Sequence, residues 1–179
     1  MQISAVLGWH PLTVPTLEEL NAEPVERAAE RFRACNAAPR FVAELLAGRP
    51  YPNAPELARR AGAVVRALSW DDVLLALAAH PRIGDRVAGS SAEAAASRRE
   101  QSSMADADAA VRAALLEGNH AYEQRFDHVF LIRAAGRSPE EMLAELRRRL
   151  AHDEETERAE VSEQLAQITE LRVAAMVRA

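Results

Sequence analysis

Apolar residues recur along most of this sequence at intervals of three and four, the spacing that places them on one face of a helix. At four places a hydroxyl side chain stands three residues before a carboxylate, as Ser138 does before Glu141, which is typical of a helix start. No stretch alternates apolar and polar positions for long enough to predict a strand. These patterns predict an all-α fold with helices over residues 16–21, 23–35, 39–47, 54–67, 70–79, 91–117, 119–133, 139–151 and 154–177.

The expected boundaries depend on residues that end helices. Gly48, Gly118 and Gly136 are predicted helix ends, because glycine readily adopts the left-handed conformation that closes a helix. Segments 49–53 and 87–90 are predicted loops. The chain has 179 residues, of which 49% are hydrophobic, and it can therefore bury one sizeable core. We predict a single domain over residues 1–179, a compact bundle of eight or nine helices.

Charge and composition narrow the classes of function. The net charge is −5 and all 22 basic residues are arginines, so neither a general nucleic-acid binder nor a lysine Schiff base is expected. The basic run Arg147–Arg149 is predicted to be a solvated helix face. Cys35 is the single cysteine, which excludes an intramolecular disulfide. Residues 1–10 do not resemble a signal peptide and no run of ~18 apolar residues predicts a membrane span, so the cytoplasm is the expected location.

The segment around His80 is the first candidate site. An apolar helix precedes His80, and Pro81 disfavours helical geometry at the residue before it, so His80 is predicted at a helix C-terminus. There the helix dipole is expected to favour a protonated imidazole. A histidine that changes its charge near neutral pH suits proton transfer. The alternative is a histidine that only caps the last carbonyls of its helix.

The second candidate is Glu100, which shares a predicted helical face with Ser97, Met104 and Leu115. The apolar members of that face predict that it points into the core. A carboxylate turned inward is costly unless it pairs with a cation or binds a ligand. A ligand contact and an internal ion pair with one of the arginines both stay open for Glu100.

A third feature is a predicted helical stripe formed by Phe126, Val129, Phe130 and Arg133. It runs toward Gly136, where main-chain amides and carbonyls left free at a helix end would suit the polar edge of a heterocycle. More often, such a stripe is simply part of the core.

The remaining signals exclude more than they assign. Arg172 lies among apolar positions of the last predicted helix, and its spacing alone indicates an ordinary ion-pairing arginine. The five histidines include no pair at a spacing suited to zinc, and there is no glycine-rich phosphate loop, so neither a metal nor a cofactor is expected. Acid–base chemistry remains.

Three segments together resemble the 2-oxo-4-hydroxy-4-carboxy-5-ureidoimidazoline (OHCU) decarboxylases. They are His80-Pro81-Arg82-Ile83-Gly84, Ser97-Arg98-Arg99-Glu100-Gln101 and Phe130-Leu131-Ile132-Arg133-Ala134. A His-Pro pair alone is weak evidence, but its combination with the Ser-x-x-Glu-Gln and Phe-Leu-Ile segments downstream is specific. Leu171-Arg172-Val173 also looks like the closing Leu-Arg-Leu of that family, so the likeness spans nearly the whole chain. Arg82-Ile83 departs from the pair that many relatives carry after His-Pro.

The resemblance implies an all-helical, cofactor-free enzyme that converts a product of urate oxidation and hydrolysis to (S)-allantoin and CO2. It implies that His80 is the catalytic acid/base and that Glu100 is essential. The implied substrate contacts are Pro81, Ser97, Arg98, Arg99, Glu100, Gln101, Phe130, Leu131, Ile132, Arg133, Ala134 and Arg172. A small-molecule substrate is the expected partner, and because relatives are often dimers, a homodimer is the assembly to test.

Two other functions stay open at this point. In one, the chain is a helical ligand-binding or regulatory domain in which His80 and Glu100 only recognise a small molecule. In the other, it is a decarboxylase that acts on a related ureido or imidazoline acid.

Overall fold

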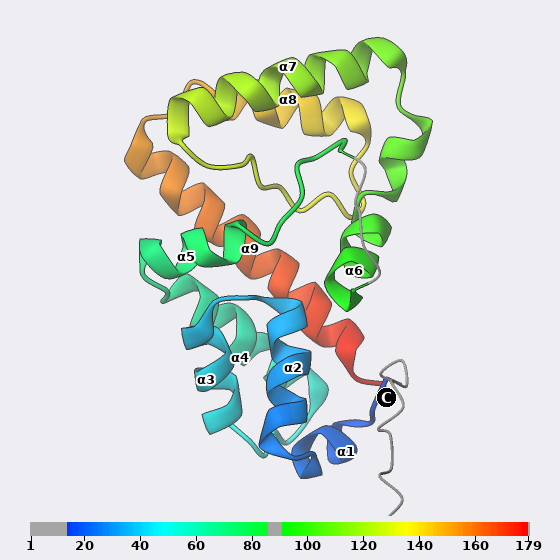
Figure 1. Cartoon of the computed structure of the whole chain (residues 1–179), viewed down its shortest axis with the longest axis vertical. Helices are drawn as coiled ribbons and strands as arrows, with labels where there is room; N and C mark the ends of the chain where they lie inside the picture. The colour runs from blue at the N-terminus through cyan, green and yellow to red at the C-terminus, as the bar shows by residue number, and fades with distance from the viewer. Residues whose placement is uncertain (1–13, 86–90, 179) are drawn as a thin grey trace, which may run out of the picture.

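The computed structural model describes residues 14–85 and 91–178 and confirms the all-α prediction (Figure 1). Its helices are α1 (Leu17–Ala22), α2 (Val25–Cys35), α3 (Pro39–Ala47), α4 (Ala54–Arg66), α5 (Trp70–Leu77), α6 (Ala92–Glu100), the 3-10 helix η1 (Ser102–Asp106), α7 (Ala109–Phe126), α8 (Pro139–Arg149) and α9 (Glu154–Met176). The predicted loop 87–90 and residues 1–10 lie outside the described residues. None of the described helices is both long and apolar enough to cross a membrane.

Helix starts are where the sequence patterns predicted best. Ser138 and Glu141 form the expected reciprocal capping box, in which the Ser138 hydroxyl accepts from the Glu141 amide (3.2 Å) and the Glu141 carboxylate accepts from the Ser138 amide (2.7 Å). Thr16 caps α1 in the same way, and the Ser69 hydroxyl caps α5. At α6 the pattern pointed to Ser90, which lies outside the described residues, but the capping hydroxyl belongs to Ser91 and accepts from the Ala94 amide. Short polar side chains satisfy amides that a helix start leaves free, so these starts can be located from local sequence.

The predicted helix over 91–117 is wrong, because the chain breaks into α6, η1 and α7. Ser102 and Ser103 begin η1, one residue after α6 ends, and Asp108 is the N-cap of α7. Such short polar residues compete for backbone hydrogen bonds and disfavour an uninterrupted helix. Met104 and Leu115, expected on one continuous face, are both buried, but they reach the core from η1 and α7 respectively.

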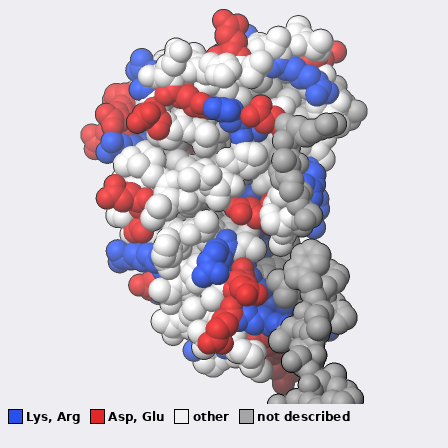
Figure 2. All heavy atoms as spheres, viewed as in Figure 1, with Lys and Arg blue, Asp and Glu red and all other residues white. Residues whose placement is uncertain are grey.

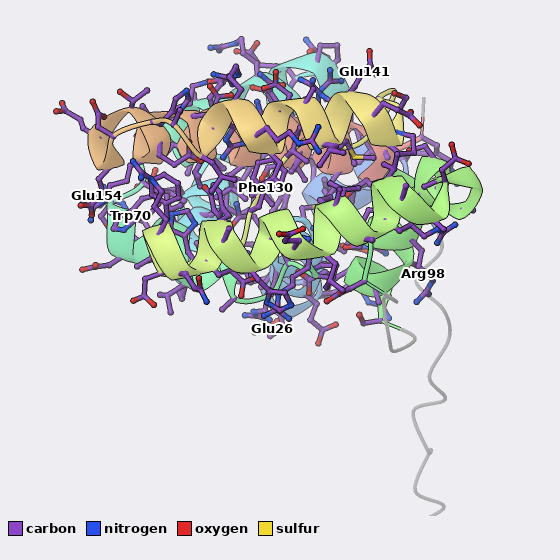
Figure 3. All side chains as sticks on the ribbon, turned by 90° about the horizontal axis from the view of Figure 1, so that it is seen from above. Glu26, Trp70, Arg98, Phe130, Glu141 and Glu154 are labelled. Atoms are coloured by element: carbon purple, nitrogen blue, oxygen red, sulfur yellow. The ribbon has the colours of Figure 1, made fainter. Side chains whose placement is uncertain are left out.

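Gly118 is a predicted helix end, but this prediction is wrong, because the residue lies inside α7. A Cβ atom at Gly118 would lie 2.5 Å from Cδ2 of Leu146 in α8. Figures 1 and 3 show α7 and α8 side by side. The glycine is therefore present for close helix packing. Gly48, by contrast, does cap the C-terminus of α3 as predicted, but with a φ of −77° and not in the left-handed conformation.

The helix predicted over 119–133 is also wrong beyond Phe126. Asp127 has a φ of 59°, the left-handed conformation that ends α7, and residues 129–134 have no regular secondary structure. Gly136, with a φ of 81°, makes a turn before α8 and does not cap a helix. Since residues 129–134 make no helical hydrogen bonds, their main-chain groups are free to bond elsewhere.

The 129–134 segment lies between two hydrophobic clusters. The larger cluster packs α2, α3, α4 and α5 against the long helix α9, and Leu131 belongs to it. The smaller cluster joins α7 and α8, and it includes Phe130, Ile132 and Ala134. This alternation is typical of an extended chain, in which successive side chains point to opposite sides. Figure 1 shows the segment, in yellow-green, crossing beneath α7 toward the start of α8.

Most of the described charged side chains lie at the surface, but one arginine of the basic run is buried. On the face drawn in Figure 2, acidic and basic side chains are interspersed and do not gather by sign. The run Arg147–Arg149 is only partly the solvated face that was predicted, because the Arg149 side chain is fully buried. Nothing local distinguishes Arg149 from its neighbours. Its partners lie on other elements, as described below.

Candidate active site

His80 follows α5 as predicted, beyond its C-terminal residue Leu77. The His80 amide donates to the Leu77 carbonyl (2.9 Å), and ring atom Nδ1 lies 2.9 Å from the carbonyl oxygen of Ala76. Since a carbonyl can only accept, Nδ1 carries the proton and Nε2 keeps a lone pair. Nε2 is buried and has no hydrogen-bond partner in the described part of the chain. The capping contact and a free reactive nitrogen thus coexist in one imidazole.

The expectation that the helix dipole would keep His80 charged is wrong. Burial, together with the positive charge of Arg172, lowers the pKa of His80 to about 4, against the opposing effects of the Ala76 carbonyl and Glu100. The dipole contributes only ~0.3–1 kcal/mol at a helix end, less than the loss of hydration of a buried charge. At neutral pH, His80 is therefore neutral and able to accept a proton at Nε2.

Glu100 forms the internal ion pair that its sequence position left open. Nε and Nη2 of Arg172, from α9, donate to the two carboxylate oxygens of Glu100 at 2.7 and 2.8 Å. Nη2 of Arg172 also donates to the hydroxyl of the buried Ser97 (3.2 Å). Nη1 of Arg172 is buried and lacks a partner among the described residues. The bidentate pair fixes the guanidinium and leaves one donor for an anion.

These groups line one small cavity. The predicted site residues that line it are His80, Pro81, Ser97, Glu100, Gln101, Phe130, Leu131, Ile132, Ala134 and Arg172. Ile83 and Ile168 line it as well and were not predicted. Ile83 lies within the His80–Gly84 segment, and Ile168 precedes Arg172 by one helical turn. Both could therefore have been predicted from their positions relative to the motif residues.

Three predicted contacts are not brought into this cavity. Successive residues of a helix are rotated by about 100°, so Arg98 and Arg99 lie on other faces of α6 than Glu100. Arg99 lines a neighbouring groove, which shares Glu100 and Arg172 with this cavity and also contains Cys35, on α2. The Arg133 side chain is not part of the cavity lining. The main-chain amide of Arg133 donates to Oε1 of Gln164 in α9 (2.9 Å).

A second cavity adjoins the first and shares His80, Pro81 and Ser97 with it. Its wall includes Glu93, a residue that was not among the predicted site residues. Burial raises the pKa of Glu93, and its buried Oε1 has no partner in the described ranges. Residues 93, 97 and 100 share one helical face, which is the signal that would have found it.

The loop after Pro81 is held in place by helices on two sides. Nδ2 of Asn119, from α7, donates to the Ile83 carbonyl (2.9 Å), and Oε1 of Gln101 accepts from the Gly84 amide (3.1 Å). Gly84 has a φ of 87°, a conformation that L residues rarely adopt. The loop therefore holds Pro81 and Ile83 in a fixed position against the cavity.

An all-helical protein that brings a neutral imidazole, a carboxylate and a fixed guanidinium into one small cavity has the features of an acid–base enzyme for a small anionic molecule. No group of three or more metal-binding side chains occurs within residues 14–85 and 91–178.

Comparison with known proteins identifies the family. A model of the OHCU decarboxylases matches residues 21–174. A crystal structure of an OHCU decarboxylase in the presence of (S)-allantoin has a TM-score of 0.70 and 26% sequence identity, covering 82% of this chain and 96% of that chain. A crystal structure of an (S)-allantoin synthase shares the fold, with a TM-score of 0.69 and 19% identity, covering 92% of this chain and 54% of that chain. No curated protein matches. The chain belongs to the OHCU decarboxylase family.

Proposed function

We propose that this chain decarboxylates OHCU to (S)-allantoin and CO2 in urate degradation, without a cofactor, and that His80, Glu100 and Arg172 carry the reaction. The observation that supports this most directly is the pair of unpartnered polar atoms, Nε2 of His80 and Nη1 of Arg172, on residues that line one cavity. One is a proton acceptor and the other a donor for an anion. A hydroxy acid requires both.

The substrate explains why no electron sink has to be supplied from outside. In OHCU, one ring carbon carries the hydroxyl and the carboxylate, and its neighbour is doubly bonded to a ring nitrogen. When the bond to the carboxylate breaks, CO2 leaves and the electron pair moves through the new carbon–carbon double bond onto that nitrogen, which takes up a proton from solvent. The adjacent ring carbonyl shares the charge. This internal delocalisation replaces a bound electron-withdrawing cofactor.

His80 then completes the conversion to allantoin. Its neutral Nε2 accepts the hydroxyl proton as that oxygen becomes a carbonyl, and the imidazolium returns a proton to the neighbouring ring carbon. Because His80 is held by the Ala76 carbonyl, it serves one face of the ring only. Delivery to one face would set the S configuration.

Arg172 and Glu100 act as a unit in this proposal. Nη1 of Arg172 donates to the substrate carboxylate and orients it, while Glu100 and Ser97 hold the guanidinium. Once CO2 has left, the same positive charge stabilises the developing anion. Four residues of the 129–134 segment, Phe130, Leu131, Ile132 and Ala134, supply the wall against the ring.

The experiment generates OHCU in situ from urate with urate oxidase and 5-hydroxyisourate hydrolase and then adds this protein. We expect CO2 release and (S)-allantoin formation faster than the spontaneous decay. Equal rates with and without the protein would refute decarboxylation of OHCU. A rate increase confined to a related ureido or imidazoline acid would instead identify that acid as the substrate.

Location, domain organisation and assembly are also proposals. We propose that the chain works in the cytoplasm as a single domain, and that it forms a homodimer, as its family resemblance implies. Sedimentation velocity at micromolar concentration tests the dimer, which a single monomeric boundary would contradict.

A further inference from the structure

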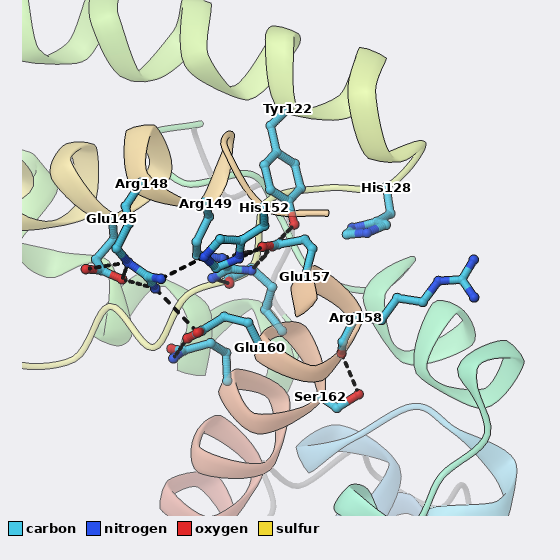
Figure 4. A network of polar contacts seen from close by, with 12 residues as sticks. Tyr122, His128, Glu145, Arg148, Arg149, His152, Glu157, Arg158, Glu160 and Ser162 are labelled. Atoms are coloured by element: carbon cyan, nitrogen blue, oxygen red, sulfur yellow. Dashed lines mark hydrogen bonds and ion pairs between the residues drawn. The ribbon is translucent and has the colours of Figure 1, made fainter. Parts of the chain in front are cut away.

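A buried network of polar side chains adjoins the 129–134 segment on the side of α8 and α9 (Figure 4). At its centre Nε of Arg149 donates to Oε1 of Glu157 (2.9 Å), and both side chains are fully buried. The Tyr122 hydroxyl, from α7, donates to the same carboxylate oxygen. His152 Nδ1 lies 2.9 Å from the other oxygen, Oε2. Glu157 therefore holds Arg149 in one orientation.

Arg149 contacts the 129–134 segment in two ways. Its Nη1 donates to the main-chain carbonyl of Leu131 (2.7 Å), and its guanidinium lies 4.7 Å from the centre of the Phe130 ring. The first contact is a charge-assisted hydrogen bond and the second a cation–π contact. Leu131 and Phe130 both line the proposed active-site cavity.

Gln164 holds the same segment from α9. Its Oε1 accepts from the Arg133 amide (2.9 Å), and its Nε2 donates to Glu160, one turn earlier in α9 (3.0 Å). In an extended chain, the polar main-chain groups of residues 131 and 133 point to one side and those of residue 132 to the other. The bonds from Arg149 and Gln164 thus leave the main chain of Ile132, which also lines the cavity, facing away from them.

Burying a guanidinium only to bond one carbonyl would be unfavourable, because both Arg149 and Glu157 lose their hydration. A planar guanidinium, however, provides several donors at fixed angles, so it can bind a carboxylate and a carbonyl at once. We infer that Arg149, held by Glu157, is a positioning residue that sets the place of the 129–134 wall and thereby the fit of the substrate ring. The inference rests on the proposed function of the cavity.

The kinetic test compares Arg149→Lys with a matched control. Lysine keeps the charge beside Glu157, but its single ammonium group cannot replace the fork that binds Glu157 and Leu131 together. We expect KM to rise roughly tenfold with kcat changed much less, because a displaced wall weakens binding of substrate and transition state alike. A merely structural defect would lower the active fraction, and hence apparent kcat, with KM unchanged.

Glu23→Gln is the control. It weakens another nearly buried pair, Glu23–Arg31 (2.8 Å), which lies outside the proposed cavity. We expect wild-type KM from Glu23→Gln. If Arg149→Lys fails to fold, Gln164→Met removes the acceptor of the Arg133 amide and is expected to raise KM in the same direction. Wild-type KM in every folded variant of Arg149 and Gln164 would overturn the inference.

A second readout does not depend on catalysis. Leu131-Ile132 is the one Leu-Ile peptide in the sequence. Labelling with 13C-carbonyl leucine and 15N isoleucine therefore gives a single carbonyl–amide cross-peak, which reports the Leu131 carbonyl directly. We expect Arg149→Lys to move this peak and Glu23→Gln to leave it in place. An unmoved peak in Arg149→Lys would contradict the inference, whereas a wild-type protein without decarboxylase activity would refute the proposed function alone.

Discussion

Arg172 and Glu100 form a bidentate ion pair at the wall of the candidate site, although they are 72 residues apart in the sequence. The Arg172 side chain is only 3% exposed. The geometry makes the two residues interdependent. Glu100 needs a cation, and Arg172 needs a carboxylate to remain buried. Any change to one of them therefore alters the orientation of the other.

Replacing Glu100 by alanine should for this reason affect both activity and stability. We expect a loss of turnover of at least ~10²-fold, because the Arg172 guanidinium loses its fixed orientation. We also expect a loss of about 3 kcal/mol in the free energy of unfolding, since a buried charge is left unpaired. Urea unfolding and the coupled assay measure the two effects. Wild-type stability would show that the pair is not formed in solution.

His80 should make the stability of the protein depend on pH. Its pKa is about 4 in the folded protein and near 6.5 when unfolded, so the unfolded chain binds more protons between these values. The stability from this group is fully present above pH 6.5 and is lost as pH falls toward 4, by about 3 kcal/mol. Urea unfolding at pH 7 and pH 4.5 should show a smaller difference for His80→Asn than for wild type. Equal differences would contradict a buried neutral imidazole.

Gly118→Ala sets two known effects against each other. Alanine favours a helix interior by ~1 kcal/mol over glycine, whereas forcing an atom into a packed contact costs ~1–3 kcal/mol. Because the added Cβ would lie 2.5 Å from Cδ2 of Leu146, we expect the packing cost to dominate, with a net loss of about 1 kcal/mol. Thermal unfolding measures it. A raised Tm would mean that α7 and α8 are less closely packed at Gly118 than the 2.5 Å approach implies.

Local patterns predicted most of the helices and the residues of the motifs, because capping hydroxyls and apolar spacing act over a few residues. They failed over residues 129–134, since an apolar run such as Val129–Ile132 looks alike whether it is helical or extended. What decides its conformation is tertiary: Arg149 and Gln164 bond its main chain from other helices. The family resemblance named this segment, but not the residues that hold it.

Arg149 and Glu93 are two further residues whose surroundings could not be predicted from local sequence. Arg149 was expected in solvent because its neighbours are basic, but its buried partners lie on α7, on α9 and in the 129–134 segment. Glu93 lies on the face of α6 that carries Ser97 and Glu100, yet one carboxylate on a helix is not a signal by itself. Burial, which makes both residues notable, is a property of the assembled fold.

The most direct test of the central claim is the dichroism of allantoin formed from enzymatically generated OHCU, with wild-type protein and with His80→Asn. Wild type should give a rapid signal of the S enantiomer. His80→Asn should be slower by at least ~10²-fold, the usual contribution of a general acid/base, while its far-ultraviolet helical signal stays intact. A folded His80→Asn variant that forms (S)-allantoin at the wild-type rate would contradict the role of His80, and a wild-type rate equal to spontaneous decay would contradict decarboxylation of OHCU.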